Sequence, residues 1–199
     1  MIEHHGWQAP AYFTSGDGEV AHIRASGGLA DLSWTLKFDL KGRGLQQPVG
    51  AGPEASWWVV GRLHGLITCE PTAGDLVRER LEQIQIALAE PSLPPPLYVT
   101  DVSSVYAHLL LAGPRSREVL NKLTSLNLSD TSMENLACAQ ASLAHVHATI
   151  LRKDSTGIPA YQLLVSREYG ESVWESVLHA GHEFNIVPFG LEAQRTLQG

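Results

Sequence analysis

Two segments of this chain resemble one another, and this internal repeat constrains the fold more than any other feature of the sequence. Residues 31–42 and 101–113 each begin with Asp, an aliphatic residue and Ser, continue with a strand-like run, and end at Gly. An apolar strand pattern that recurs at a long interval is typical of one supersecondary unit used twice. The sequence therefore predicts two related lobes, which we place at residues 1–95 and 96–199.

Length, composition and charge narrow the classes of protein to consider. The chain has 199 residues, of which 44% are hydrophobic and 18% charged, as is ordinary for a globular domain with a substantial core. A net charge of −7 without any basic run argues against a nucleic-acid partner. No apolar stretch is long enough to span a bilayer, and the first residues lack the features of a signal peptide. We therefore expect a cytoplasmic protein.

The two cysteines give little further guidance on compartment. Cys69 and Cys138 lie far apart in the sequence and form no metal or redox motif. Free thiols in a reducing compartment are expected, and a single disulfide is the alternative.

Hydrophobic periodicity and turn residues predict the elements of both halves. In the first half we expect a helix over 19–26, a strand over 35–40, a Gly- and Pro-rich loop over 42–53, a hairpin over 57–70, a helix over 76–88 and a stiff connector over 91–96. In the second half we expect a strand over 105–111, a helix over 116–123, strands over 142–151 and 161–165, and a helix over 170–181. This order predicts an α+β architecture with helices packed on one face of antiparallel sheets.

Four short patterns in the second half occur together in a known order. They are Asp-Val-Ser at 101–103 with Leu-Ala-Gly-Pro-Arg-Ser at 111–116, Thr156-Gly157 with Tyr161, Trp174 with Leu-His-Ala-Gly at 178–181, and Val-Pro-Phe-Gly-Leu-Glu-Ala at 187–193. In this order they resemble the folate-binding aminomethyltransferase family, which includes the T-protein of glycine cleavage and the gamma subunit of heterotetrameric sarcosine oxidase. The resemblance is weak over residues 1–95 and better after residue 98, and the ordered set carries it rather than any single motif.

The resemblance implies a two-lobed fold and tetrahydrofolate-linked transfer of an aminomethyl or methylene group. It implies that Thr156, Gly157 and Tyr161 line a folate pocket; the structural alternative is a β-turn at 156–157 that leads Tyr161 into a sheet. The C-terminal barrel lobe of the larger family members is expected to be absent here, as it is from the small gamma subunits.

Two departures from the family pattern concern the reacting site itself. The segment 42–53 is short and contains no Asp or Glu, whereas the family ends a longer loop there with the acid that assists C–N cleavage. The Glu expected to hydrogen-bond the pterin falls at Ile158, and loss of such a buried partner costs about 1–3 kcal/mol. The catalytic residue is therefore unidentified, and weak or lost tetrahydrofolate binding is expected.

Three functions follow as hypotheses, and they leave open whether the chain is an enzyme. The preferred one is a non-catalytic accessory subunit of a sarcosine- or methylamine-type oxidase, whose larger flavoprotein partner would carry flavin and NAD. The second is a standalone tetrahydrofolate-dependent aminomethyltransferase that has moved its acid to Asp31, Asp101, Glu54 or Glu70. The third is a structural homodimer that pairs through exposed edge strands or through the hairpin bearing Trp57 and Trp58. The alternative role of these two tryptophans is packing in the core.

Other polar residues are interpreted structurally. Asp31 and Asp101 each precede a Ser by two residues, which suits Asx-type turns better than catalysis. His145 and His147 share a face if they lie on one strand, and His108 is a third imidazole, but no carboxylate or Cys stands at ligand spacing. No metal site is predicted.

Overall fold

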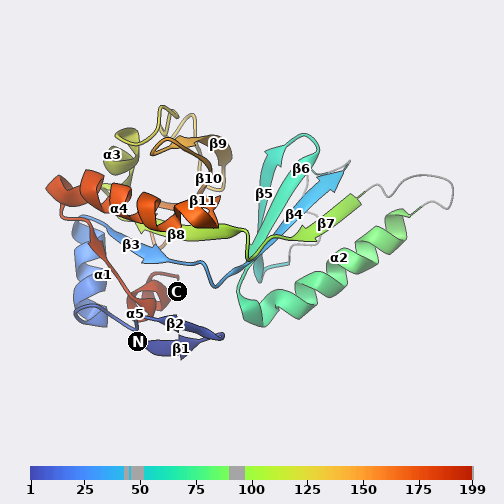
Figure 1. Cartoon of the computed structure of the whole chain (residues 1–199), viewed down its shortest axis with the longest axis horizontal. Helices are drawn as coiled ribbons and strands as arrows, with labels where there is room; N and C mark the ends of the chain where they lie inside the picture. The colour runs from blue at the N-terminus through green and yellow to red at the C-terminus, as the bar shows by residue number, and fades with distance from the viewer. Residues whose placement is uncertain (43–44, 46–51, 90–96, 199) are drawn as a thin grey trace. The chain divides into compact units, whose positions relative to one another are not determined.

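The computed structural model describes residues 1–42, 45, 52–89 and 97–198, which form two compact units (Figure 1). Unit 1 consists of Met1–Ser33 and Tyr106–Gly199, and unit 2 consists of Trp34–Val105. These units do not follow the linear division expected at residues 95 and 96, because the first 33 residues pack with the C-terminal half. That the two lobes are copies of one ancestral repeat stays a prediction.

Unit 1 is built on a six-stranded sheet with strand order β12-β3-β8-β11-β10-β9, in which only β12 and β3 run parallel. Its strands are β1 (Ile2–His4) and β2 (Trp7–Ala9), which pair separately, β3 (Gly28–Asp31), β8 (Tyr106–Ala112), β9 (Cys138–Leu143), β10 (Val146–Arg152), β11 (Ala160–Ser166) and β12 (Val187–Pro188). Its helices are α1 (Gly16–Ala25), α3 (Ser116–Asn121), α4 (Gly170–Gly181) and α5 (Leu191–Gln198), with short 3-10 turns at Arg167–Tyr169 and His182–Phe184.

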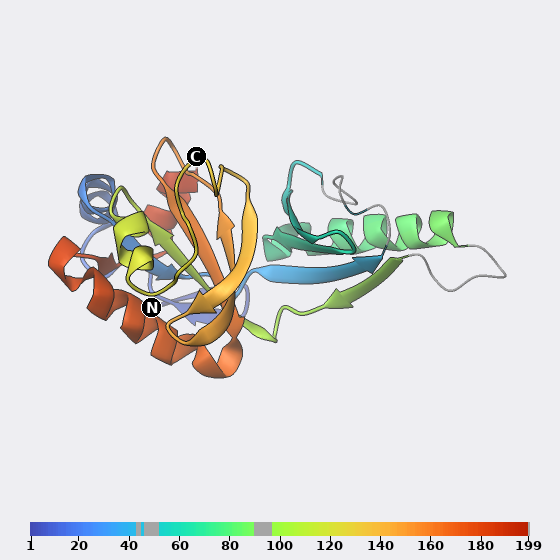
Figure 2. The same ribbon diagram turned by 90° about the horizontal axis from the view of Figure 1, so that it is seen from above.

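The main core of unit 1 lies between this sheet and the helices α3 and α4. Leu109 and Leu163 project from neighbouring strands toward Val119 of α3 and Val177 of α4, and all four are buried. Complete burial of such a side chain stabilises a fold by about 1.5–3 kcal/mol. The helices α1 and α5 lie on the other side of the sheet (Figures 1 and 2).

Unit 2 is a four-stranded antiparallel sheet of order β5-β6-β4-β7 covered by one helix. Its elements are β4 (Leu36–Gly42), β5 (Ala55–Gly61), β6 (His64–Cys69), a 3-10 turn at Pro71–Ala73, α2 (Gly74–Leu88) and β7 (Leu97–Asp101). Val77, Leu81 and Ile84 recur at helical spacing and pack α2 against the sheet. Gly74 permits this approach, since a Cβ there would lie 2.3 Å from a methyl group of Leu36.

The repeated Asp-x-Ser triplets mark the two places where the chain passes from one sheet to the other. β3 and β4 are consecutive in the chain but belong to different sheets, and the same holds for β7 and β8. β3 pairs antiparallel with β8, while β7 pairs antiparallel with β4. This strand exchange explains why residues 1–33 belong to unit 1.

Each triplet forms the Asx turn that the sequence predicts. Oδ1 of Asp31 accepts a hydrogen bond from the Ser33 amide at 2.8 Å, and Oδ1 of Asp101 accepts one from the Ser103 amide at 3.0 Å. An aspartate that bonds the backbone two residues on fixes a local turn at low cost.

The structure confirms the predicted α+β fold class and most of the expected elements, and both sheets are open among the described strands. The strand expected over 142–151 is wrong, because Ala144 and His145 have φ values of 48° and 68° and form the turn between β9 and β10. His145 and His147 therefore do not share a strand face, and His108 is buried on β8 beside Gln162. None of the described helices has the length and apolar character needed to cross a membrane.

Two expected segments cannot be compared with the structure. The loop over 42–53 lies largely outside the described residues, and the connector over 91–96 lies wholly outside them.

Candidate functional site

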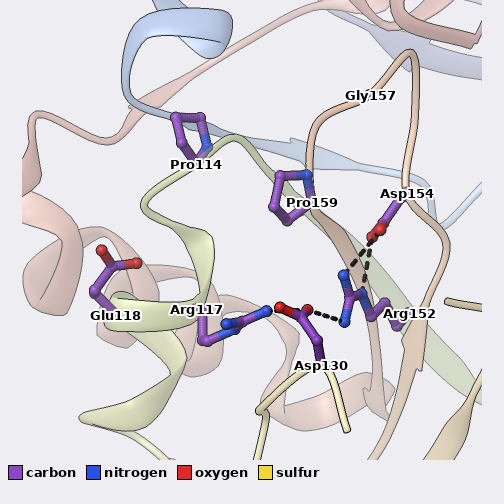
Figure 3. A pocket seen from close by; sticks show the side chains of 8 residues that line it. All are labelled: Pro114, Arg117, Glu118, Asp130, Arg152, Asp154, Gly157 and Pro159. Atoms are coloured by element: carbon purple, nitrogen blue, oxygen red, sulfur yellow. Dashed lines mark hydrogen bonds and ion pairs between the residues drawn. The ribbon is translucent and has the colours of Figure 1, made fainter. Parts of the chain in front are cut away.

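A surface pocket of about 550 Å³ lies in unit 1 beside the hairpin that carries Thr156 and Gly157 (Figure 3). Its lining combines two arginines with three carboxylates and two prolines. The lining residues are Pro114, Arg117, Glu118, Asp130, Arg152, Asp154, Gly157 and Pro159.

Arg152 is the central charge of the pocket and ends strand β10. Its Nε and Nη2 donate to the two carboxylate oxygens of Asp154, both at 2.9 Å, as a bidentate pair. Its Nη1 donates to Oδ1 of Asp130 at 2.6 Å and to the carbonyl of Met133 at 2.7 Å. The side chain is only 8% exposed, so this complete set of partners is what makes its burial tolerable. These hydrogen bonds, that of Asp154 first, raise the pKa of Arg152.

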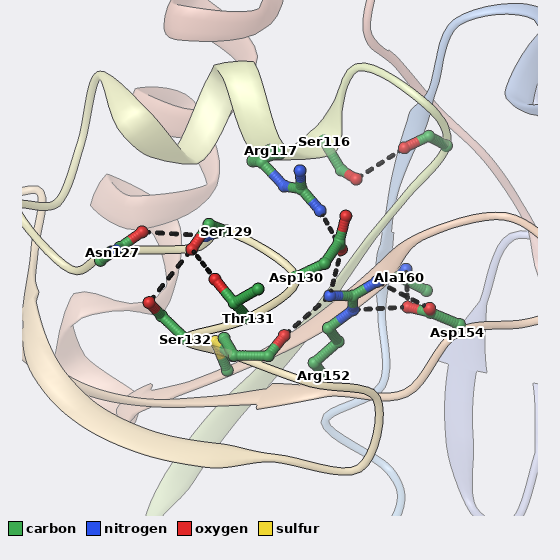
Figure 4. Close-up of polar contacts among 12 residues, drawn as sticks. Ser116, Arg117, Asn127, Ser129, Asp130, Thr131, Ser132, Arg152, Asp154 and Ala160 are labelled. Atoms are coloured by element: carbon green, nitrogen blue, oxygen red, sulfur yellow. Dashed lines mark hydrogen bonds and ion pairs between the residues drawn. The ribbon is translucent and has the colours of Figure 1, made fainter.

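Asp130 bridges the two arginines of the pocket from the segment between α3 and β9. Its Oδ1 accepts hydrogen bonds from both Arg152 and Arg117, although its side chain is 67% exposed (Figure 4). These bonds, that of Arg152 first, lower the pKa of Asp130. The carboxylate is therefore held in its ionised form and is poorly suited to donate a proton.

Hydroxyl groups next to Asp130 fix the loop that presents it. The amide of Ser129 donates to Oδ1 of Asn127 at 3.0 Å, and its Oγ lies 3.2 Å from Oγ1 of Thr131 and 3.1 Å from Oγ of Ser132. The carboxylate of Asp130 takes no part in these contacts (Figure 4).

Tyr161 lies beneath the pocket rather than in it. It is fully buried on β11, directly opposite Arg152 of β10, whose Cζ lies 6.0 Å from the centre of its ring. Its hydroxyl and Nε of Arg117 are both buried, and neither has a hydrogen bond of normal geometry among the described residues. The two groups nonetheless lie close enough that the Tyr161 contact is the largest factor raising the pKa of Arg117.

Thr156 and Gly157 form the tip of a two-residue hairpin turn. Their φ values are 45° and 82°, and Ser155 and Ile158 exchange backbone hydrogen bonds of 2.9 and 3.0 Å around them. A turn with two positive φ angles favours glycine, so turn geometry by itself accounts for Gly157. Oγ1 of Thr156 accepts a long hydrogen bond of 3.5 Å from Arg24 of α1. The structure thus brings Gly157 alone of the three expected folate residues to the pocket wall, and their role in binding folate stays a prediction.

Two of the four acids considered as replacement catalysts are fixed in turns. Asp31 accepts the Ser33 amide, and Asp101 accepts both the amide and the hydroxyl of Ser103, the latter at 2.6 Å. Arg78 also donates to Asp101 at 3.1 Å. Burial by itself would raise the pKa of Asp101, but the bonds from Ser103 and Arg78 outweigh it and lower the pKa.

The other two acids lie near the ends of elements in unit 2. Glu54 forms an ion pair with Arg80 of α2. Glu70 stands directly before the 3-10 turn that starts α2, and its carbonyl accepts the Ala73 amide at 3.0 Å.

Trp57 and Trp58 are both packing residues of unit 2. Trp58 is fully buried and its Nε1 donates to Oγ1 of Thr68 at 2.9 Å. Trp57 lies over Gly65, where a Cβ would come within 2.3 Å of the indole ring. The core interpretation of this pair agrees with the structure better than an exposed partner anchor does.

The sequence reading did not find the cluster formed by Arg117, Asp130, Arg152 and Asp154. One signal was available, since Arg152 directly follows the apolar pair Ile150-Leu151 and Asp154 stands two residues later. A cation at the end of a buried strand needs a partner, because an unpaired buried charge is costly. Nothing in the spacing shows that Arg117 and Asp130 complete the cluster.

Comparison with known proteins places this fold in a family. Residues 71–198 match the model of the GCVT N-terminal domain. The chain belongs to this family. A relative of this GCVT-domain chain, an aminomethyltransferase of Acidobacterium capsulatum, is 27% identical over 220 residues, which cover 100% of this chain and 58% of the relative. The sarcosine oxidase subunit alpha of Rhizobium meliloti is 27% identical over 208 residues, which cover 90% of this chain and 21% of the relative. The chain thus spans only part of the length of these relatives.

Solved structures confirm the predicted fold. The glycine cleavage system aminomethyltransferase T from Bartonella henselae matches with a TM-score of 0.73 at 15% identity, covering 99% of this chain and 57% of that one. A chain of heterotetrameric sarcosine oxidase from Corynebacterium sp. U-96 matches with a TM-score of 0.61 at 19% identity, covering 89% of this chain and 96% of that one. The resemblance seen in the sequence to aminomethyltransferases and sarcosine oxidase subunits is therefore confirmed.

Proposed function

We propose that this GCVT-domain chain is a non-catalytic accessory component of an amine-oxidising assembly in one-carbon metabolism, with weak or lost tetrahydrofolate binding. The observation that carries the proposal is the state of the candidate acids. Asp31, Asp101 and Glu54 are each engaged in a turn or an ion pair. The bonds from Ser103 and Arg78 lower the pKa of Asp101, whereas a general acid near neutral pH needs a raised one.

The residue at the expected pterin-binding position supports the same conclusion. Ile158 is half-buried, and its backbone N–H and C=O are both used by Ser155 across the hairpin. Its apolar side chain offers no acceptor for the amino group of a pterin. An amino group buried there without a partner would weaken binding by about 1–3 kcal/mol.

The proposed partner is the larger flavoprotein subunit of a sarcosine- or methylamine-type oxidase. Two findings support it: curated relatives include alpha subunits of sarcosine oxidase, and one matching structure is a chain of a heterotetrameric sarcosine oxidase. A cytoplasmic location stays a prediction that goes with this assembly.

Calorimetric titration of the full chain with tetrahydrofolate tests the loss of folate binding. We expect no binding with a dissociation constant below about 100 μM, so the free energy of binding is expected to be weaker than about −5.5 kcal/mol. Micromolar binding that Tyr161→Phe or Thr156→Val abolishes would instead establish a folate-dependent aminomethyltransferase and overturn the accessory role. Tyr161→Phe is preferred to Tyr161→Ala, because truncation of a fully buried ring costs about 3–5 kcal/mol of stability by itself.

Analytical ultracentrifugation tests whether the chain binds the proposed flavoprotein partner. The chain is co-expressed with the alpha subunit of a sarcosine oxidase as the candidate flavoprotein partner, and flavin absorbance is followed together with the mass of the complex. Co-sedimentation in a fixed ratio supports the subunit role. A chain that forms a stable homodimer and does not bind the flavoprotein would support the structural alternative instead.

A further inference from the structure

The pocket of unit 1 already holds one carboxylate, and that carboxylate belongs to the chain itself. Asp130 lies between Arg117 and Arg152, and its side chain is 67% exposed. An aspartate with this exposure gains little from either ion pair, because solvent screens the attraction. Asp130 can therefore be exchanged for another anion at small cost.

The two arginines differ in what remains when Asp130 leaves. Arg152 keeps both bonds to Asp154 and its bond to the Met133 carbonyl, so its guanidinium stays in place. Arg117 keeps only its contact with the buried hydroxyl of Tyr161 among the interactions of the described residues. Its Nε, also buried, has no hydrogen bond of normal geometry even with Asp130 present. Nε of Arg117 is thus a donor of this cluster that the Asp130 carboxylate does not satisfy.

We propose that this pocket binds a small molecule through a carboxylate group that displaces Asp130 from Arg117 and Arg152. The fixed fork of a guanidinium matches the two oxygens of a carboxylate, and two guanidinium groups that already share one such group define its position. The volume of about 550 Å³ lies within the range of small-molecule sites.

Charge balance favours a carboxylate over a phosphate. Once Asp130 has rotated out, and with Glu118 paired to Arg115, the remaining charges of Arg117, Arg152 and Asp154 sum to +1, which one carboxylate neutralises. A phosphate dianion would leave the pocket negative beside Glu118, whose own partner is Arg115 at 3.0 Å. The overall charge of −7 opposes a dianion further.

The exchange requires only the Asp130 side chain to rotate. The loop that bears it is fixed by the contacts of Ser129 with Asn127, Thr131 and Ser132, which do not involve the carboxylate. Figure 4 shows the Asp130 carboxylate pointing away from these hydroxyls and toward the arginines.

Nuclear magnetic resonance tests the site directly. The full chain is titrated with acetate and, separately, with phosphate, at an ionic strength held constant with NaCl. The signals followed are Nε–H of Arg117 and Arg152 and the backbone amide of Asp130. We expect saturable shifts of all three with acetate and tighter binding of acetate than of phosphate. Equal shifts with NaCl by itself, or tighter binding of phosphate, would overturn the proposal.

Two variants and a matched control complete the test. Asp130→Asn removes the internal competitor and should tighten acetate binding by about tenfold or more, because a tethered group competes at a millimolar or higher effective concentration. Arg117→Gln should abolish the shifts at Arg152. Asp75→Asn removes an exposed aspartate paired with an arginine in unit 2 and should leave the affinity unchanged. An affinity that Asp130→Asn leaves unchanged would refute the displacement. None of these outcomes depends on folate or on a flavoprotein partner, so they stand apart from the proposed function.

Discussion

The backbone amide of Lys37 donates a hydrogen bond of 3.0 Å to Oγ of Ser103, and the Lys37 carbonyl accepts the amide of Val102 at 2.9 Å. The other triplet makes the same pair of contacts: the amide of His108 donates to Oγ of Ser33 at 3.1 Å, and its carbonyl accepts the Leu32 amide at 2.7 Å. Each triplet thus binds both backbone groups of one residue on the strand it accompanies. These paired contacts fix the triplet at the end of β3 against β8 and the triplet at the end of β7 against β4.

Removal of either serine hydroxyl should destabilise the fold. Ser33→Ala and Ser103→Ala each leave a backbone amide without its side-chain acceptor, at an expected cost of about 1–2 kcal/mol in the free energy of unfolding. Urea denaturation followed by circular dichroism measures this cost. Ser142→Ala on the exposed part of β9 is the matched control and should change stability by less than about 0.5 kcal/mol. Equal effects of all three substitutions would contradict the role given to the triplets.

Glu19 should be required for the attachment of the C-terminal helix. Its carboxylate is 2% exposed and accepts the amides of Phe13 and Thr14 at 2.5 and 2.9 Å and the amide of Gly190 at 2.9 Å. Glu19→Ala leaves these amides unpaired, so the free energy of unfolding should fall by about 2–4 kcal/mol. Amide hydrogen exchange should accelerate in α5 as well as in residues 13 and 14.

A control separates this effect from a change in net charge. Glu171→Ala removes an exposed carboxylate from the first turn of α4 and should cost less than about 1 kcal/mol. Unchanged hydrogen exchange in α5 of the Glu19→Ala variant would refute the attachment.

Loss of the Arg152 guanidinium should be among the most damaging single polar substitutions in unit 1. Arg152→Gln leaves Asp154, whose side chain is 25% exposed, without its bidentate partner. Breaking such a buried pair costs about 3–5 kcal/mol, which thermal and urea unfolding both measure. Arg115→Gln removes an exposed arginine that pairs with Glu118 three residues away, and it should cost less than about 0.5 kcal/mol. Similar losses for the two variants would show that burial of the Arg152 network contributes nothing.

The two thiols should make the protein less stable in alkali. Burial raises the pKa of Cys69 to about 11 and that of Cys138 to about 12, from a usual value of 9.0. In the unfolded chain both thiols ionise above about pH 9 while the folded state keeps them protonated. Their contribution to stability is therefore complete below about pH 9 and is lost as the pH rises through about 11 for Cys69 and about 12 for Cys138.

Other groups titrate in alkali, so a difference measurement isolates the thiols. The free energy of unfolding is compared at pH 8 and pH 10.5 for the wild-type chain and for Cys69→Ala and Cys138→Ala. We expect a smaller loss between the two pH values in each variant than in the wild type. An identical pH dependence in all three would show that the thiols ionise alike in the folded and unfolded states.

The sequence by itself determined the local elements and the family. Apolar residues at helical spacing set α2, and the apolar runs around Gly61 and Gly65 set the hairpin of β5 and β6. The Asp-x-Ser triplets specified their own Asx turns. Each of these follows from interactions between residues a few positions apart, which a periodic pattern records. The turn at 144 and 145 was missed because Ala144 is an unusual residue at positive φ and no Gly, Asn or Asp marks the turn.

Only the tertiary structure decided which strands pair and which charges meet. β3 pairs with β8 and β7 pairs with β4 across long sequence separations. The hydrophobic pattern of a strand does not indicate which other strand it pairs with. Gly113 is needed because a Cβ there would lie 2.3 Å from Cα of Gly27. The motif at 111–116 does not reveal this contact, because Gly27 is distant in the sequence. The pocket likewise joins Arg117, Asp130 and Arg152 from separate elements. Such contacts depend on how the sheet is assembled, because the free energy that selects them comes from burial and pairing between segments far apart in the chain.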